Sequence, residues 1–132
     1  PKIRAVKKEA KHYHLDWTVV KDIGARFEDM TACHLLKWCH FIADTEGRDF
    51  ELRYFRDIDK REVDFVLTED GKPIHFIECK KSFRGRNIAL RYLKQRFPQA
   101  KATQIFLEEG EEYMDKDGIR SQSAASFLAT LV

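Results

Sequence analysis

The chain has 132 residues, of which 43% are hydrophobic and 35% charged, so it can form a core and is not a low-complexity chain. Its net charge of +2 does not by itself indicate a polyanionic partner. No apolar run reaches the roughly 20 residues of a membrane span, and no signal-peptide pattern opens the chain. We therefore expect one cytoplasmic domain over residues 1–132, with its cysteines reduced. Because the chain begins with Pro1 rather than Met, we expect it to be a piece of a longer protein.

The first predicted elements are a short strand in PKIRAV and a helix over residues 22–43. Residues 7–21 show no clear period and are left unassigned. Asp22 is a suitable N-cap for the helix, and side chains then recur at spacings of three and four residues. The stripe that we expect to be buried consists of Glu28, Ala32, Leu35, Cys39 and Ile42. One member of this stripe is therefore a carboxylate.

Three strands are predicted next, over residues 50–56, 62–67 and 74–80, as a β-meander whose second turn is built on Asp70-Gly71. A second helix is predicted over residues 86–97 and ends before a proline.

The last predicted elements are a fourth strand in ATQIFLEE, a hairpin or loop around Asp117-Gly118 and a short helix in SAASFLATL. The expected fold is α/β, with a mixed sheet of about four or five strands flanked by the two longer helices.

Three charged residues stand in the meander where apolar residues are expected. Glu78 and Lys80 project from the same face of one strand, because side chains alternate along a strand. Asp64 lies on the neighbouring strand, and pairing of the two strands would bring the three side chains to one end of the sheet. Glu28 would approach the same end, since the apolar stripe of its helix must pack on the sheet.

Carboxylates gathered in this way would repel one another unless a cation neutralised them. Carboxylate oxygens are ligands that suit Mg²⁺ or Mn²⁺. We therefore expect a divalent-metal site on Asp64 and Glu78 that could act on phosphate esters, with a lysine to orient water or phosphate. A cross-strand salt bridge among Asp64, Glu78 and Lys80 is the alternative, and Glu28 could instead interact with the helix dipole.

The pattern EVDF followed across a hairpin by IECK resembles the core signature of the PD-(D/E)xK nuclease superfamily, which includes type II restriction enzymes and archaeal Holliday-junction resolvases. Three further segments, IGARFEDMTACHLL, YFRDIDKREVDFVL and GIRSQSAASFLATL, are similar to the C-terminal domain of unknown function attached to many archaeal and bacterial AAA-type ATPases. Together they cover nearly the whole chain.

The resemblance implies a restriction endonuclease-like fold and hydrolysis of DNA phosphodiester bonds that depends on Mg²⁺ or Mn²⁺. By position, the helix acid of the superfamily falls on Glu28, its two strand acids on Asp64 and Glu78, and its lysine on Lys80. The main-chain carbonyl of Cys79 could also bind the metal. The chain departs from the pattern because no proline precedes Asp64 and because a cysteine stands in the middle of ExK.

Between residues 80 and 101 the chain has eight basic residues and no acidic one, which makes contact with a polyanion such as DNA a candidate role beside that of a solvated helix face. The predicted DNA-contacting residues are Lys81, Arg84, Arg86, Arg91 and Lys94. The resemblance also implies an N-terminal ATPase module as a partner, but the chain lacks GxxxxGK[ST], so no ATP site is assigned to it. The alternative function is a non-catalytic module that binds DNA or a partner for such an ATPase.

The repeat of Cys and His in CHLLKWCH is also typical of zinc ligands. Six residues advance about 600° around a helix, so Cys33 and Cys39 would point roughly 120° apart and could not share one metal ion. We therefore do not expect a zinc site there.

Overall fold

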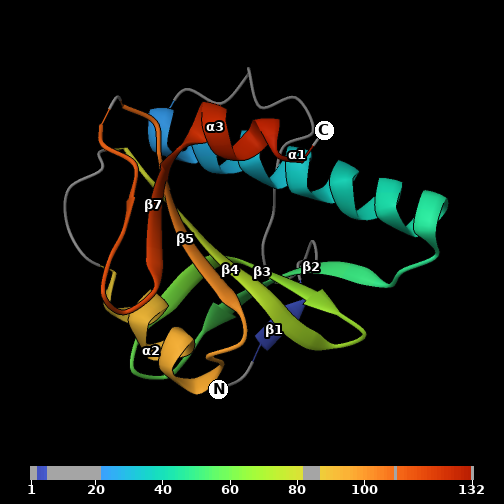
Figure 1. Ribbon diagram of the computed structural model, residues 1–132, viewed down its shortest axis with the longest axis horizontal. Helices are drawn as coiled ribbons and strands as arrows, with labels where there is room; N and C mark the ends of the chain where they lie inside the picture. The colour runs from blue at the N-terminus through green and yellow to red at the C-terminus, as the bar shows by residue number, and fades with distance from the viewer. Residues whose placement is uncertain (1–2, 6–21, 82–86, 109, 132) are drawn as a thin grey trace.

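A computed structural model of the chain describes residues 22–81, 87–108 and 110–131, together with the backbone of residues 3–5 (Figure 1). The elements form one seven-stranded mixed sheet with helices on both of its faces, which confirms the predicted α/β class. The sheet has more strands than the four or five predicted, because the region around Asp117-Gly118, predicted as a hairpin or loop, adds two strands to it. No helix within the described residues is long and apolar enough to cross a membrane.

The long helix α1 (Ile23–Glu46) begins as predicted and ends three residues later than predicted. The Asp22 side chain accepts a hydrogen bond of 2.8 Å from the Ala25 N–H, so it forms the expected cap. The helix continues to Gly47, whose φ of 65° lies in the left-handed region, and whose N–H donates to the Ala43 carbonyl. Gly47 is the first glycine after the predicted end of the helix, and glycine readily adopts the left-handed conformation that ends a helix.

The predicted meander is confirmed as three antiparallel strands, β2 (Phe50–Arg56), β3 (Glu62–Glu69) and β4 (Lys72–Lys80). Asp70 and Gly71 have φ angles of 52° and 81° and form a two-residue turn between β3 and β4. Positive φ at both central residues suits the right-handed twist of the flanking strands, which explains the choice of Asp-Gly. On the edge of β2 opposite β3, the short strand β1 (Ile3–Ala5) pairs antiparallel with residues 53–55.

The second half of the sheet is mostly parallel. Helix α2 (Ile88–Arg96) begins two residues later than predicted, because Asn87 caps it through a 2.6 Å bond from the Leu90 N–H. It connects β4 to the parallel strand β5 (Lys101–Phe106).

A hairpin and a helix complete the fold. Strand β6 (Tyr113–Met114) turns back into β7 (Ile119–Ser123), which pairs in parallel with β5. The short helix α3 (Ala124–Ala129) follows directly, close to its predicted place. The strand order across the sheet is β1-β2-β3-β4-β5-β7-β6.

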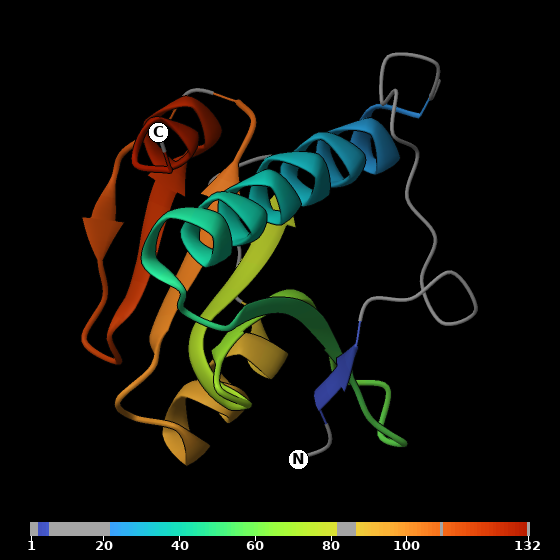
Figure 2. The same cartoon turned by 90° about the vertical axis from the view of Figure 1, so that its right-hand side faces the viewer.

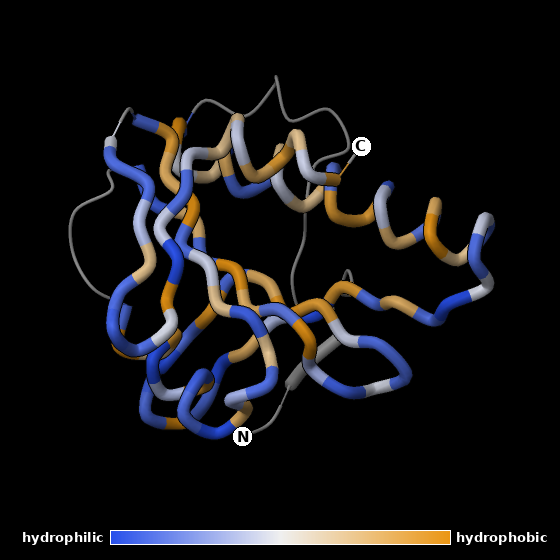
Figure 3. Tube along the Cα trace, viewed as in Figure 1, coloured by the Kyte–Doolittle hydropathy of each residue, from blue (hydrophilic) through white to orange (hydrophobic). Residues whose placement is uncertain are grey.

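Helices α1 and α3 lie on one face of the sheet and α2 lies on the other, as two views at right angles show (Figures 1 and 2). Each face has its own apolar cluster. Phe65, Ile77 and Ile105 pack under α1 and α3, whereas Phe55 and Phe76 form a cluster with Leu93 of α2 on the other face. The central strands accordingly carry many of the hydrophobic segments and the turns carry hydrophilic ones (Figure 3).

Candidate functional site

The predicted site lies where β3 and β4 separate. Their backbone pairing runs from Glu69 opposite Lys72 to Phe65 opposite Ile77. One residue further along each strand, the Asp64 N–H donates to Glu78 Oε1 at 3.2 Å and the Cys79 N–H donates to Asp64 Oδ2 at 3.0 Å. Carboxyl oxygens therefore accept the hydrogen bonds that backbone carbonyls accept elsewhere in the ladder. The two acids face each other because strand register, as predicted, places them on the same side of the sheet.

Glu78 is the more buried member of this pair, with 8% of its surface exposed. Burial raises its pKa well above the ordinary range, and the neighbouring Asp64 carboxyl raises it further. Its second oxygen, Oε2, accepts a hydrogen bond from the Asn87 side-chain amide. A carboxyl group in this setting keeps its proton at neutral pH unless a cation joins the pair.

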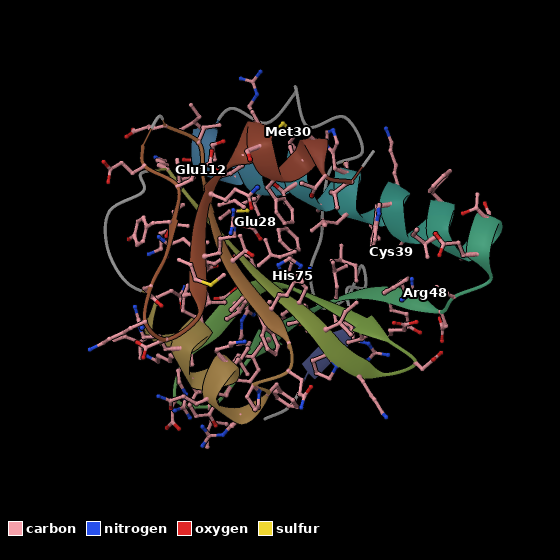
Figure 4. All side chains as sticks on the ribbon, in the orientation of Figure 1. Glu28, Met30, Cys39, Arg48, His75 and Glu112 are labelled. Carbon is pink, nitrogen blue, oxygen red and sulfur yellow. The ribbon has the colours of Figure 1, made fainter. Side chains whose placement is uncertain are left out.

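A cleft of about 420 Å³ opens at this end of the sheet. Glu28 reaches it from the second turn of α1, above the central strands (Figure 4). All four residues predicted as catalytic therefore line one cleft. The complete lining consists of Gly24, Phe27, Glu28, Asp64, Glu78, Cys79, Lys80 and Lys81.

The Cys79 side chain belongs to the opposite face of β4 from Glu78. Its thiol contacts Thr31 of α1, and burial followed by the charge of Asp64 raises the pKa of the thiol. It also packs against the apolar cluster under α1. The thiol is therefore held by the helix, and the main chain of Cys79 is the part that meets Asp64.

The residues present fit a hard divalent cation. Asp64, Glu78 and the main chain of residue 79 offer oxygen atoms, which Mg²⁺ and Mn²⁺ prefer. The hydrogen-bond donors to the Glu78 side chain among the described residues, the Asp64 N–H and the Asn87 amide, are both neutral. A buried carboxyl group ionises more readily beside a positive charge, so a bound cation would favour the charged form of Glu78. Across the described segments no three His, Cys, Asp or Glu side chains form a ready ligand cluster, so any such site would use two carboxylates and the main chain.

The predicted DNA-contacting residues occupy different settings. Lys81 is exposed at the mouth of the cleft. Arg91 instead binds Asp115 at 2.6 Å and also pairs with Asp117, which ties α2 to the β6–β7 hairpin. The Lys94 ammonium donates to the Pro98 and Ala100 carbonyls at 2.9 and 2.7 Å. The remaining two predicted contacts, Arg84 and Arg86, lie outside the described residues.

Asn87 was missed as a site residue by the sequence prediction, which placed it inside the second helix. Its carbonyl oxygen caps α2 while its amide nitrogen holds Glu78. Asn before a helical run is a recognisable cap signal, and that signal could have located the start of α2. The contact with Glu78 depends on how α2 packs on β4, for which the sequence carries no local pattern.

Comparison with known proteins gives one family match. The profile described as "Domain of unknown function (DUF4143)" matches residues 23–127, from the first residue of α1 into α3. No curated protein and no solved structure gives a significant match. Since the matched region runs from α1 through β7 into α3 and includes the carboxyl pair and the cleft, this chain belongs to the DUF4143 family.

Proposed function

We propose that this domain is nuclease-like and hydrolyses DNA phosphodiester bonds with the help of a divalent metal ion. The observation that carries the proposal is the pairing of Asp64 and Glu78 at the end of the β3–β4 ladder, with Lys80 two residues further along β4 in the same cleft. The resemblance of EVDF and IECK to the PD-(D/E)xK signature supports the same function. In the proposed reaction, water attacks phosphorus and the bond to one ester oxygen breaks.

Each residue of the cleft has a role in this proposal. Asp64 and Glu78 would hold Mg²⁺ or Mn²⁺, together with the main-chain carbonyl of Cys79. When bound, the ion would neutralise the carboxyl pair and stabilise negative charge on the phosphoryl oxygens. Lys80 would orient the attacking water or the phosphate, and Glu28 would accept a proton from that water.

DNA would be held mainly through its phosphates. Lys81 is well placed for this role because it is exposed beside the carboxyl pair. Arg84 and Arg86 follow it closely in the sequence and are proposed to extend the same contact. Arg91 and Lys94 could contribute only in addition to their partners within the protein. Such binding would be independent of sequence and strongly dependent on salt concentration.

A second function, that of a non-catalytic module which binds DNA or a partner for an AAA-type ATPase, is favoured by one observation. Each acid of the pair accepts a backbone N–H, and Asn87 donates to Glu78, so hydrogen bonds within the protein can satisfy the pair while Glu78 is protonated. In that case the role of the pair would be to stabilise the association of β3 with β4. Under either function the three free cysteines agree with a reducing compartment, which we propose to be the cytoplasm.

Thermal melts with and without Mn²⁺ distinguish the two functions before any substrate is known. For a metal site, Mn²⁺ at one hundred times its dissociation constant should stabilise the wild type by about 2.7 kcal/mol. Lys80→Ala should keep this stabilisation, whereas Asp64→Asn should lose it. Lys72→Ala is the matched control, because Lys72 is an exposed lysine at the other end of the same strand.

The same proteins are then assayed on duplex, single-stranded and branched DNA in Mg²⁺ or Mn²⁺. We expect cleavage by the wild type and by Lys72→Ala, and none by Asp64→Asn or Lys80→Ala. If Mn²⁺ leaves the melting temperatures unchanged and no substrate is cleaved, the nuclease proposal is overturned in favour of the binding module.

A further inference from the structure

A second cavity, of about 490 Å³, lies on the α1/α3 side of the sheet. Its floor includes His75 of β4, which precedes Glu78 by three residues and projects from the opposite face of the sheet. Three residues correspond to roughly 10 Å along a strand. Figure 4 shows His75 displaced along the sheet from Glu28. The cavity is therefore separate from the carboxyl cleft. We name it the β5–β7 pocket after the strands that supply two of its three charged residues, Lys101 and Arg120. The third is Lys94 of α2, whose ammonium donates to the Pro98 and Ala100 carbonyls.

The charge of the β5–β7 pocket is positive. Arg120 of β7 is aligned with Thr103 of β5, so Lys101, two residues before Thr103, lies on the same face as a diagonal neighbour of Arg120. Both side chains are exposed, and neither makes an ion pair or a side-chain hydrogen bond within the described part of the chain. No Asp or Glu lines the pocket as far as the structure describes it. Two like charges on neighbouring strands repel each other, and a bound anion would remove that repulsion.

The floor of the pocket is neutral and largely apolar. His75 Nε2 lies 2.8 Å from Thr103 Oγ1, and the imidazole ring meets the Phe127 ring edge-on with centroids 5.8 Å apart. Burial, and then the charge of Lys101, lowers the pKa of His75 to about 4, so the imidazole is neutral at pH 7. The Gln122 amide donates to Ser126 at 2.8 Å and is thus also satisfied.

These features define a ligand with two parts. The cations require a negative head, while the Phe127 and His75 rings offer an apolar wall to a ring or hydrocarbon body. We propose that the β5–β7 pocket binds a small organic anion of about mononucleotide size, with its phosphate or carboxylate between Lys101 and Arg120 and its body against Phe127 and His75. This site shares no residue with the carboxyl cleft, and its only residue among the predicted DNA contacts is Lys94.

The test is a titration of the ¹⁵N-labelled protein, followed by NMR in metal-free buffer with EDTA at pH 7. The probes are adenosine monophosphate, benzoate and inorganic phosphate. We expect adenosine monophosphate or benzoate to shift the amide signals of residues 101–103 and 119–122, and the stronger of the two is the better model of the ligand. Inorganic phosphate should bind at least about tenfold more weakly than the better organic probe, because it lacks the apolar body.

Two variants test the assignment of the head group. Lys101→Gln and Arg120→Gln should each weaken binding by about tenfold, since each removes one charge-assisted contact. Both side chains are exposed, so the fold should be retained. Lys116→Gln, which removes an exposed lysine outside the pocket, should bind like the wild type.

His75 provides an independent measurement. A bound anion would offset the charge of Lys101, so the pKa of His75, followed through its ring proton signals, should rise in the presence of the better probe. The proposal is overturned if neither organic probe binds, if the shifted signals lie outside the pocket, or if both Gln variants bind as tightly as the wild type. Equal affinity for inorganic phosphate would overturn the assignment of the apolar body.

Discussion

Replacing Glu78 by Gln should stabilise the protein at neutral pH in the absence of metal. The folded-state pKa of Glu78 is raised by burial and by Asp64, so the folded chain binds more protons than the unfolded chain between the two pKa values. The stabilising contribution of Glu78 is therefore fully present below its unfolded pKa of about 4.3 and is lost progressively as the pH rises. The loss can reach about 1.4 kcal/mol per pH unit.

Gln resembles the protonated acid in shape, and it remains neutral at every pH. Its oxygen can still accept from the Asp64 N–H or the Asn87 amide, and its own amide can donate to Asp64. Over the roughly 2.7 pH units between the unfolded pKa and pH 7, the loss has an upper bound of about 3.7 kcal/mol. Relaxation of the site around the charged group lowers the realised value, and we expect an advantage of about 2 kcal/mol for Glu78→Gln. For a domain of this size that corresponds to an increase in melting temperature of roughly 6–10 °C.

The measurement is urea denaturation of the wild type and Glu78→Gln at several pH values from 4.5 to 8, with EDTA present. Glu108→Gln is the control, because Glu108 is exposed and lies outside both cavities. We expect the curves of free energy of unfolding against pH to meet near pH 4.5 and to diverge above it, for Glu78→Gln alone. Parallel curves for wild type and Glu78→Gln across this range would refute the assignment of a raised pKa to Glu78.

Three other substitutions test the supports around the site. Asn87→Ala should cost about 1–3 kcal/mol in urea denaturation, more than the cap variant Asp22→Ala, because it also removes a donor to Glu78; equal costs would contradict a role beyond capping. Arg91→Gln should cost about 0.5–1 kcal/mol at low salt, and less in an Asp115→Asn background; additive effects of the two changes would show that the ion pair contributes nothing. Gly47→Ala should lower stability by about 1 kcal/mol in thermal melts, because φ is 65° there; an unchanged melting temperature would count against the left-handed ending of α1.

The sequence was informative where a local pattern determines the structure. The spacing of apolar residues located α1, and Asp70-Gly71 located the turn that sets the register of β3 and β4. Continued without interruption from that turn, the register would place Asp64 opposite Ile77. A shift between Leu67 and Thr68 adds one residue to β4 and brings Asp64 opposite Glu78, and no local sequence pattern indicates this shift. The assignment of Glu28 to the same cleft needed one further step, the packing of a helix stripe on the sheet.

Features that depend on distant parts of the chain were not predicted. Strand β7 reads IRSQS, which lacks an alternation of apolar and polar residues, yet Ser121 and Gln122 are buried. Its place beside β5 follows from parallel pairing, for which there is no turn signal. The two roles of Asn87, and the carboxylate partners of Arg91, likewise arise from the way α2 packs against β4 and the β6–β7 hairpin.

The two outermost strands of the sheet limit how copies of this domain can associate. β1 has three residues and β6 has two, so the edge strands of the described sheet offer only short rows of backbone groups for pairing with another chain. The segment before β6 also carries the exposed residues Glu111 and Glu112, whose charges oppose the close approach of an identical edge. Extended edges are sites where sheets add strands from other molecules and aggregate. Within the described residues, short and charged edge strands therefore disfavour the addition of a strand from another copy of the domain.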